Sequence, residues 1–449
     1  KMGGGLMQLV AYGAQDIYLT GNPQITFWKV SYKRHTNFSM ESIEQTFNGT
    51  AGYGQTVYVT VSRNGDLINK TYLQLDVPKL TNGDKYVNYY GLRLLQSVTV
   101  EIGGQQIDKH FSDWLYIWNE LTLPAGKKYA YERMVGADGD IITNEGATLY
   151  VPLEFWFCRN VGLALPLIAL QYHEVKININ FETETNCTIS SPSIPNNSPT
   201  FTASLWVDYI FLDTDERRKF AQLSHEYLIE QLQFTGSESI SSGSSARVKL
   251  NFNHPCKELI WVAKYAGTST SRHHWYNYTV KADGSFLGNT EFPGSTNVAV
   301  TSFDDAGGSN VFALSDLGTG DYLKRTILNT EPGLHPNATN PFDTCLLQLN
   351  GNDRFAVRNG SYFNYVQPFQ HHTNIPANAG INVYSFALTP EDHQPSGTLN
   401  MSRIDTAILT MDIYDNTSYV AANSSLYVYA TNYNVLRILS GMGGLAYSN

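Results

Sequence analysis

The chain has 449 residues and a net charge of −10 at pH 7, and its longest run of basic side chains is Arg217-Arg218-Lys219. This balance excludes strong nucleic-acid binding through the phosphates, and the length exceeds what one hydrophobic core usually supports. Only 16% of the residues are charged, whereas 13% are aromatic and 36 are Gly, which is typical of an all-β protein with many turns. We therefore expect two β domains.

Residues 1–24 are apolar but rich in glycine. Leu6, Leu9 and Val10 stand among glycines, and Thr20-Gly21-Asn22-Pro23 predicts a turn. Such a segment cannot build a core alone. We expect it to form an arm that docks on another surface through Leu6, Leu9 and Val10.

Residues 25–212 are predicted to form the first β domain. Stretches rich in β-branched and aromatic residues, separated by turn residues, predict its strands. They cover residues 25–32, 38–47, 56–62, 67–77, 94–102, 150–158, 172–181 and 201–212. Phe111, Leu115 and Trp118 recur at helical spacing and predict a helix over residues 108–121, which Pro124 ends.

Residues 213–223 are the densest run of charge in the chain. A short solvated segment of this kind is typical of a domain boundary. We place the linker at residues 213–224, with a helical turn. A second β domain follows over residues 225–438, and the glycine-rich residues 439–449 are predicted to be a flexible or docking tail.

The second domain repeats sequence features of the first in the same order. The matching segments are 44–49 with 230–236, 66–68 with 258–260, 100–104 with 348–351, 151–177 with 383–411, and 204–207 with 425–428. Their separations differ along the chain, which indicates one duplicated domain rather than a short-period solenoid. The second copy is longer between Lys264 and Phe342, where we expect long loops. The predicted fold is all-β, with two tandem eight-stranded antiparallel jelly rolls and short helices in the loops.

Tyr384 to Asp405 is therefore predicted to be the second copy of a structural corner. It joins a strand before Pro390 to another strand after the Pro395-Ser396-Gly397 turn. Arg403 and Asp405 are interpreted as a charge pair that fixes this corner.

Catalytic motifs are missing from the sequence, which contains no Walker, GxSxG or HExxH pattern. The four cysteines, Cys158, Cys187, Cys256 and Cys345, lack metal-site spacing and are expected to be buried free thiols. One alternative remains, a carbohydrate-binding or cupin-like metalloenzyme in which His371, His372 and a nearby carboxylate hold a metal. We favour a protein that is not an enzyme and has no cofactor.

Asn-x-Ser/Thr sequons are numerous in the chain, as expected for a sequence rich in Asn, Ser and Thr. Five of them fall in predicted loops and are the candidate glycosylation sites. They are Asn277, Asn337, Asn400, Asn416 and Asn423.

Long blocks of the sequence resemble a known family. They are residues 9–38, 62–68, 101–110, 162–177, 207–238, 384–405 and 432–449. These blocks are similar to the double jelly-roll major capsid proteins of nucleocytoplasmic large DNA viruses, and especially to those of algal viruses such as the chlorella viruses. The resemblance weakens over residues 186–199 and 264–340, so no loop shape or glycan position carries over there.

The resemblance implies a homotrimer whose six jelly rolls form a pseudo-hexagonal capsomer. Such capsomers would tile an icosahedral shell around an internal membrane, with the arm facing minor capsid proteins. No direct contact with nucleic acid is expected. The start of the sequence shows no signal peptide, and the longest apolar run, Val161 to Leu170, is about half a membrane span. We thus expect synthesis in the host cytoplasm and a final place in the virion.

Overall fold

The computed structural model describes residues 4–25, 27–28, 30–80, 84–189, 200–241, 243–264, 275–276, 278–281, 338–376, 379–414 and 424–447. The chain divides into two units, Lys1–Phe38 and Ser39–Asn449. The candidate sequons Asn277, Asn337, Asn416 and Asn423 lie outside the described residues, as does most of the segment from Lys264 to Phe342.

The first unit contains two short helices, α1 (Gly4–Val10) and α2 (Ile17–Thr20), and neither has a buried residue. The strand predicted over residues 25–32 is not seen: none of the described residues from 25 to 37 is in a strand. The side chains of Phe27 and Trp28 are 98% and 89% exposed. No strand among the described residues pairs with this apolar segment, and an unpaired extended segment is not stable by itself.

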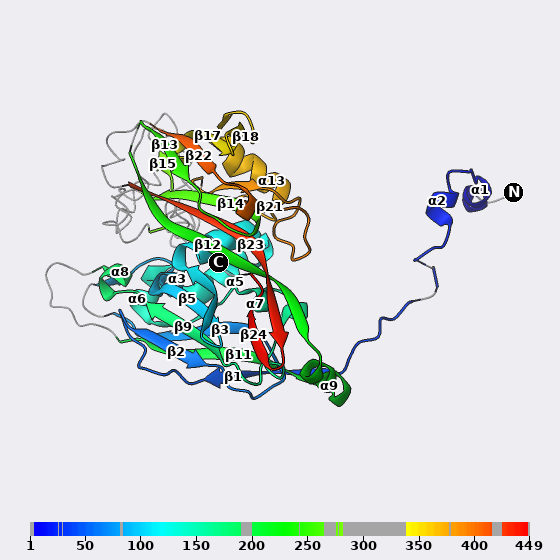
Figure 1. Cartoon of the computed structure of the whole chain (residues 1–449), viewed down its shortest axis with the longest axis horizontal. Coiled ribbons are helices and arrows are strands. Elements are labelled where there is room, and N and C mark those ends of the chain that lie inside the picture. The colour runs from blue at the N-terminus through cyan, green and yellow to red at the C-terminus, as the bar shows by residue number, and fades with distance from the viewer. Residues whose placement is uncertain are drawn as a thin grey trace, which may run out of the picture. The chain divides into compact units, whose positions relative to one another are not determined.

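The first half of the second unit contains two antiparallel sheets (Figure 1). The strand order of one sheet is β1 (Phe38–Gln45), β11 (Thr202–Leu212), β3 (Leu67–Val77) and β7 (Ala147–Pro152), and β8 (Leu165–Pro166) also pairs with β3. The order of the other is β2 (Thr56–Thr60), β9 (Val175–Phe181), β5 (Leu95–Ile102) and β6 (Gln105–Phe111). Alternate residues of β9 are buried, as its alternation of apolar and polar residues requires.

The second half contains two further antiparallel sheets. One has the order β12 (His225–Ile240), β23 (Ser424–Leu439), β14 (Pro255–Lys264) and β20 (Asn382–Ser385), with β21 (Leu399–Asn400) on β14 and β24 (Met442–Leu445) on β23. The other has the order β13 (Ser245–Lys249), β22 (Ala407–Ile413), β17 (Phe342–Leu349) and β18 (Asn352–Asp353), with β19 (Arg358–Asn359) on β17. The long strands β12 and β23 pair from His225 with Ile438 to Ile240 with Ser424, and Figure 1 shows them side by side.

The two halves have the same sheet order. The sheet β1-β11-β3-β7 of the first half corresponds strand by strand to the sheet β12-β23-β14-β20 of the second half. The sheet β2-β9-β5-β6 corresponds in the same way to the sheet β13-β22-β17-β18. Every predicted sequence echo falls on such a pair of strands; for example, residues 100–104 begin in β5 and residues 348–351 begin in β17. The prediction of two duplicated antiparallel eight-stranded folds is confirmed.

Short helices occupy the connections, as predicted. They are α3 (Tyr90–Leu94), α4 (Ser112–Thr122), α5 (Ala125–Val135), α6 (Gly139–Glu145), α7 (Trp156–Arg159), η1 (Val161–Leu163), α8 (Glu184–Cys187), α9 (Thr214–Gln222), the π-helix η4 (Tyr362–Val366), α13 (Gln367–His371) and η5 (Met401–Arg403). Short strand pairs are formed by β4 (Lys85–Tyr86) with β10 (Thr188–Ile189) and by β15 (Val280–Lys281) with β16 (Ala338–Thr339). None of the helices in the described ranges combines the length and apolar character that a membrane crossing requires.

Three further segments differ markedly from the sequence prediction. The predicted helix over residues 108–121 begins only at Ser112, because residues 105–111 form β6 and pair with β5 across the Gly103-Gly104 turn. The predicted strand over residues 150–158 ends at Pro152 and is followed by α7. The predicted tail contains β24, which returns along β23 and pairs Gly443 with Ile438. Gly441 supplies the tight turn with a φ of 83°.

The charged linker forms α9 across most of its length. Asp213 caps the helix by accepting a hydrogen bond from the backbone N–H of Thr214. Arg217 then binds Asp66 of the first half with two bonds, 2.9 Å from Nε to Oδ1 and 3.1 Å from Nη2 to Oδ2. The helix is thereby attached to the loop that precedes β3.

Candidate functional site: the junction of the two halves

The most elaborate arrangement of side chains lies where residues 39–212 meet residues 225–447, and we call this region the junction. Its apolar part joins α4 and β6 to the sheet of β12 and β23. Trp114 is fully buried and its ring centroid is 5.7 Å from that of Tyr429. Phe111 makes an edge-to-face contact with Phe234 at 5.2 Å. Aromatic pairs of this kind stabilise a contact beyond the area that they bury.

Strand β12 contacts β6 through side chains that bond to backbone groups. Gln231 donates from Nε2 to the carbonyl of Ile107 at 2.5 Å, and Asp108 accepts at Oδ1 from the N–H of Leu232 at 3.1 Å. The other oxygen of Asp108 lies 2.9 Å from Nε2 of His110, and both side chains are buried. These bonds fix the register of β12 against β6.

Glu230 is the centre of the first charge cluster. Its Oε2 is 3.0 Å from Nη1 of Arg159 in α7, and its Oε1 is 2.8 Å from Nζ of Lys257 in β14. Burial alone would raise the pKa of the Glu230 carboxyl, but His393, whose Nδ1 is 3.6 Å from Oε1, and the charges of Lys257 and Arg159 outweigh burial and lower the pKa to about 2. The Arg159 guanidinium also lies 3.9 Å from the ring centroid of Trp118.

Asp113 of α4 is the centre of the second cluster. Lys264, the last residue of β14, places its Nζ 2.5 Å from Oδ1 of Asp113, and the Tyr278 hydroxyl donates to the same oxygen at 2.8 Å. Burial lowers the pKa of Lys264 to about 8, although the Asp113 carboxylate opposes this shift. The ring of Trp275 contacts two cations, with Lys264 at 3.9 Å and Arg93 at 3.3 Å from its centroid.

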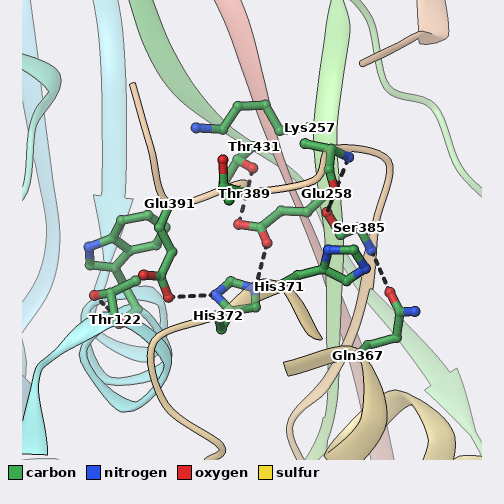
Figure 2. A network of polar contacts seen from close by, with 12 residues as sticks. Thr122, Lys257, Glu258, Gln367, His371, His372, Ser385, Thr389, Glu391 and Thr431 are labelled. Carbon is green, nitrogen blue, oxygen red and sulfur yellow. Dashed lines mark hydrogen bonds and ion pairs between the residues drawn. The ribbon is translucent and has the colours of Figure 1, made fainter. Parts of the chain in front are cut away.

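His372 is the centre of a third network, which Figure 2 shows from close by. Its Nε2 lies 2.9 Å from Oε2 of Glu258 in β14, and its Nδ1 lies 2.9 Å from Oε1 of Glu391. Burial alone would lower the pKa of His372, but Glu258 and Glu391 outweigh it and raise the pKa from 6.5 to about 9. His372 is therefore an imidazolium clamped between two carboxylates at neutral pH.

The His372 network positions the segment that follows α13 on the first half. Glu391 accepts hydrogen bonds from both the backbone N–H and the hydroxyl of Thr373. The next residue, Asn374, donates from its N–H to the carbonyl of Leu121 at 3.0 Å and from its side chain to the carbonyl of Leu123. The network thus ties the second half to the end of α4.

The C-terminal hairpin forms the last contact across the junction. His173 Nδ1 is 2.8 Å from the carbonyl oxygen of Gly443 and 3.2 Å from its backbone nitrogen, and Gln105 accepts from the N–H of Leu445 at 3.2 Å. A side chain at Gly443 would approach Leu170 Cδ2 to 2.6 Å. Strand β24 is therefore built into the fold and is not a free tail.

The structure places the predicted histidines in separate roles. His371 bonds to the carbonyl oxygen of Leu388, whereas both nitrogens of His372 face carboxylates. In the part of the chain that the structure describes, no group of three or more His, Cys, Asp or Glu side chains is arranged to hold a metal ion. The four cysteines are buried and free.

The other predicted site residues make none of the junction contacts described above. Arg403 ends η5 and Asp405 follows it; both are exposed, and no ion pair or hydrogen bond joins them within the described residues. Asn400 is exposed and caps η5 by accepting from the N–H of Ser402 at 3.1 Å. Leu6, Leu9 and Val10 are exposed on α1.

Apart from His372, which was considered as a metal ligand, the sequence prediction did not identify the charged residues of the junction. Glu230, Lys257, Glu258 and Lys264 lie in β12 and β14, which were expected only as repeats of residues 44–49 and 66–68. The sequence feature that could have indicated these residues is the presence of charged side chains at both ends of the apolar run Leu259 to Ala263, which is buried in β14. A charge that is buried in a strand requires a partner, but the sequence does not say that the partner is on α4 or α7.

Two family models match the chain and together cover most of it. "Major capsid protein N-terminus" matches residues 26–213, and "Large eukaryotic DNA virus major capsid protein" matches residues 216–444. The chain is 48% identical to the major capsid protein of Phaeocystis pouchetii virus and 45% identical to that of Paramecium bursaria Chlorella virus 1, and each comparison covers 100% of both chains.

Solved structures agree with these matches. The crystal structure of PBCV-1 VP54, fitted into a reconstruction of the virophage Sputnik, is similar with a TM-score of 0.74 and 38% identity, and the match covers 94% of this chain and 100% of that one. A chain of the quasi-atomic model of the PBCV-1 virus capsid has a TM-score of 0.71 and 39% identity, with the same coverage. The Faustovirus major capsid protein is only 14% identical but has a TM-score of 0.66 over 95% of this chain and 94% of that one, so it shares the fold.

Proposed function

Because this chain belongs to the family of large eukaryotic DNA virus major capsid proteins, we propose that it forms a homotrimer that acts as a pseudo-hexagonal capsomer. The role of the family is structural, in the virion capsid shell, and is not enzymatic. Three copies of a chain with two similar folds present six similar sides. A unit of this shape tiles a hexagonal sheet, and such sheets can form the faces of an icosahedral shell.

One observation carries the proposal, namely that the same sheet order occurs twice within one chain. A three-fold axis then generates approximate six-fold symmetry from a single gene product. The junction contributes by holding the two folds at one fixed relation, with buried charges on α4 and α7 facing β12 and β14. If the two folds could move independently, the six sides of a capsomer would not match their neighbours.

Native mass spectrometry of the purified protein tests the trimer. We expect one species at three times the chain mass of 50.1 kDa, and hexagonal particles in negative-stain images of the same sample. A monomer at micromolar concentration would contradict the proposal.

The arm is proposed to bind minor capsid proteins between the shell and an internal viral membrane. Leu6, Leu9 and Val10 are 54%, 78% and 70% exposed, and an exposed apolar set on a helix favours a protein partner. The net charge of the chain argues against direct contact with the genome. Synthesis in the host cytoplasm belongs to the same proposal.

Arg403 and Asp405 are proposed to act between subunits. Both are exposed and unpaired within the described residues, so their partners would come from another chain. We expect Arg403→Ala to lower the yield of trimer measured by size-exclusion chromatography with light scattering. An unchanged yield would remove Arg403 from the assembly surface.

Asn400 is the candidate glycosylation site that the structure describes. Its exposed position and its place in the sequon Asn400-Met401-Ser402 support this proposal. Peptide mass mapping of protein from virions tests it, and an unmodified peptide would contradict it.

A further inference from the structure

A small cavity lies between α4, α5 and residues Asn374 and Ile375. Its volume is about 180 Å³, which is room for the head of a side chain or a small organic ion but not for a folded segment. The junction contacts described above do not fill it. Its walls come from both halves of the chain.

Three tyrosines give the cavity an aromatic wall. They are Tyr89, Tyr116 and Tyr131. Tyr131 is only 8% exposed, and its hydroxyl has no hydrogen-bond partner among the residues that the structure describes. A buried hydroxyl without a partner costs free energy that a ligand could recover by bonding to it. Burial, followed by the charges of neighbouring carboxylates that include Glu120, raises the pKa of this hydroxyl, so it stays protonated at neutral pH.

The charged groups at the cavity leave it with an excess of negative charge. Glu120 and Glu132 provide two carboxylates, and Lys128 is the one cation among the lining residues. The Nζ of Lys128 is 3.4 Å from Oε1 of Glu120, and the Lys128 side chain is 34% exposed whereas that of Glu120 is 7% exposed. The lysine reaches the buried carboxylate from the solvent side, so a competing cation can replace it.

We propose that this cavity binds an organic cation through a primary ammonium or guanidinium group. Tyrosine rings attract cations to their faces. Carboxylates accept charge-assisted hydrogen bonds from N–H donors, and the Tyr131 hydroxyl oxygen can accept one more. The same chemistry is offered by a free alkylamine and by the basic side chain of a neighbouring chain. Binding of the cation does not require the proposed trimer, whereas a neighbouring chain as its source rests on the proposed assembly.

Lys128 acts as an internal competitor for the ligand. Removing its charge takes away the ion pair that Lys128 makes with Glu120, which favours the incoming ammonium group. Lys127 is the matched control, because it is the adjacent residue of the same helix, is exposed and does not line the cavity.

Isothermal titration of the full chain with spermidine tests the proposal. We expect Lys128→Gln to bind spermidine about tenfold more tightly than the unchanged protein, and Lys127→Gln to bind as the unchanged protein does. Glu132→Gln and Tyr131→Phe should each weaken binding by a factor of about three to ten. Circular dichroism and thermal melting of each variant show whether the fold is retained. Equal affinities of the Lys128→Gln and Lys127→Gln variants, or no binding by either, would overturn the proposal.

A second arm of the experiment separates the two sources of the cation. Saturating spermidine should reduce association between capsomers if a neighbouring chain supplies the basic group. It should leave association unchanged if the natural ligand is a free amine. Native mass spectrometry in the presence of spermidine measures the association between capsomers. The same spectra show the mass of bound spermidine, which must be absent from the Glu120→Gln/Glu132→Gln double variant whichever source is correct. Retention of that mass would place the amine elsewhere and overturn the site.

Discussion

Glu230 shows how a single buried carboxylate can hold two halves of a chain together. It binds Arg159 of the first half and Lys257 of its own sheet. Taking these charges out of water is costly, and the cost is offset only while all partners are present. The cluster therefore specifies one arrangement of the halves more than it adds stability.

We expect Glu230→Gln to lower the free energy of unfolding by about 3–5 kcal/mol, because the buried Lys257 and the partly buried Arg159 would keep less than their full countercharge. The matched control is Glu226→Gln, four residues earlier in β12. Glu226 binds Arg437 at 2.8 Å, but the two side chains are 60% and 56% exposed, so the loss there should be about 0–1 kcal/mol. Urea denaturation measures both, and equal losses would show that the Glu230 cluster has no special role.

Stability should also depend on the protonation of His372. Its pKa is raised from 6.5 to about 9 in the folded chain. The stabilisation is thus fully present below pH 6.5 and is lost as the pH rises through 9. Lys264 has the opposite effect on the pH dependence of stability. Its pKa is lowered from 10.5 to about 8 in the folded chain, so the fold becomes more stable as the pH rises from 8 to 10.5 and the buried lysine loses its proton.

The comparison of unchanged protein with His372→Gln isolates the histidine from Lys264. We expect the difference in free energy of unfolding between the two proteins to be largest at pH 6 and to shrink between pH 6.5 and pH 9. Chemical denaturation at several pH values measures it. A difference that is constant with pH would show that His372 is not charged in the folded chain.

The C-terminal hairpin of β23 and β24 is an element of the junction that the sequence did not predict. Strand β24 extends the sheet of β23 and meets the first half at Leu170 and His173. Gly443 leaves little room, since a Cβ would lie 2.6 Å from Leu170 Cδ2 and 3.2 Å from Ile102 Cγ2.

Gly443→Val is therefore expected to destabilise the fold by about 1–3 kcal/mol through overpacking against the buried Leu170. Gly444→Val is the control. A Cβ there meets only the end of the Gln105 side chain at 3.3 Å, which can move aside. Thermal melting compares the two variants. If Gly444→Val melts as early as Gly443→Val, the hairpin is sensitive to strand propensity and not to packing.

The sequence predicted the sheets better than the connections between them. Alternating side chains in β9 and β22 place the strands, and the echoes between the halves predict their order because duplicated segments fold alike. The strand predicted at residues 25–32 was wrong, because a strand needs a pairing partner that the propensity of its own residues does not supply. Residues 439–449 were predicted to be a flexible or docking tail, and the structure shows β24 paired with the adjacent strand β23. Asp113 and Lys264 could not be matched from the sequence, since 151 residues of chain separate two charges that only the packing of α4 on β14 brings together.

For the whole molecule, the division of the chain predicts that the arm is dispensable for folding. Residues up to Phe38 form a unit of their own, and α1 and α2 bury no side chain. Deleting residues 1–36 should leave the melting temperature of the remaining chain within about 2 °C of the full chain. Differential scanning calorimetry measures this, and a loss of cooperative melting would show that the arm supports the fold.

The central claim is that one chain supplies two equivalent folds to a three-fold symmetric capsomer. The most direct measurement is the native mass of the purified chain together with the rotational symmetry of its particles in electron microscope images. The account predicts a single species at three times 50.1 kDa with a hexagonal outline. A dimer or a tetramer, or a trimer with a plainly triangular outline, would contradict it.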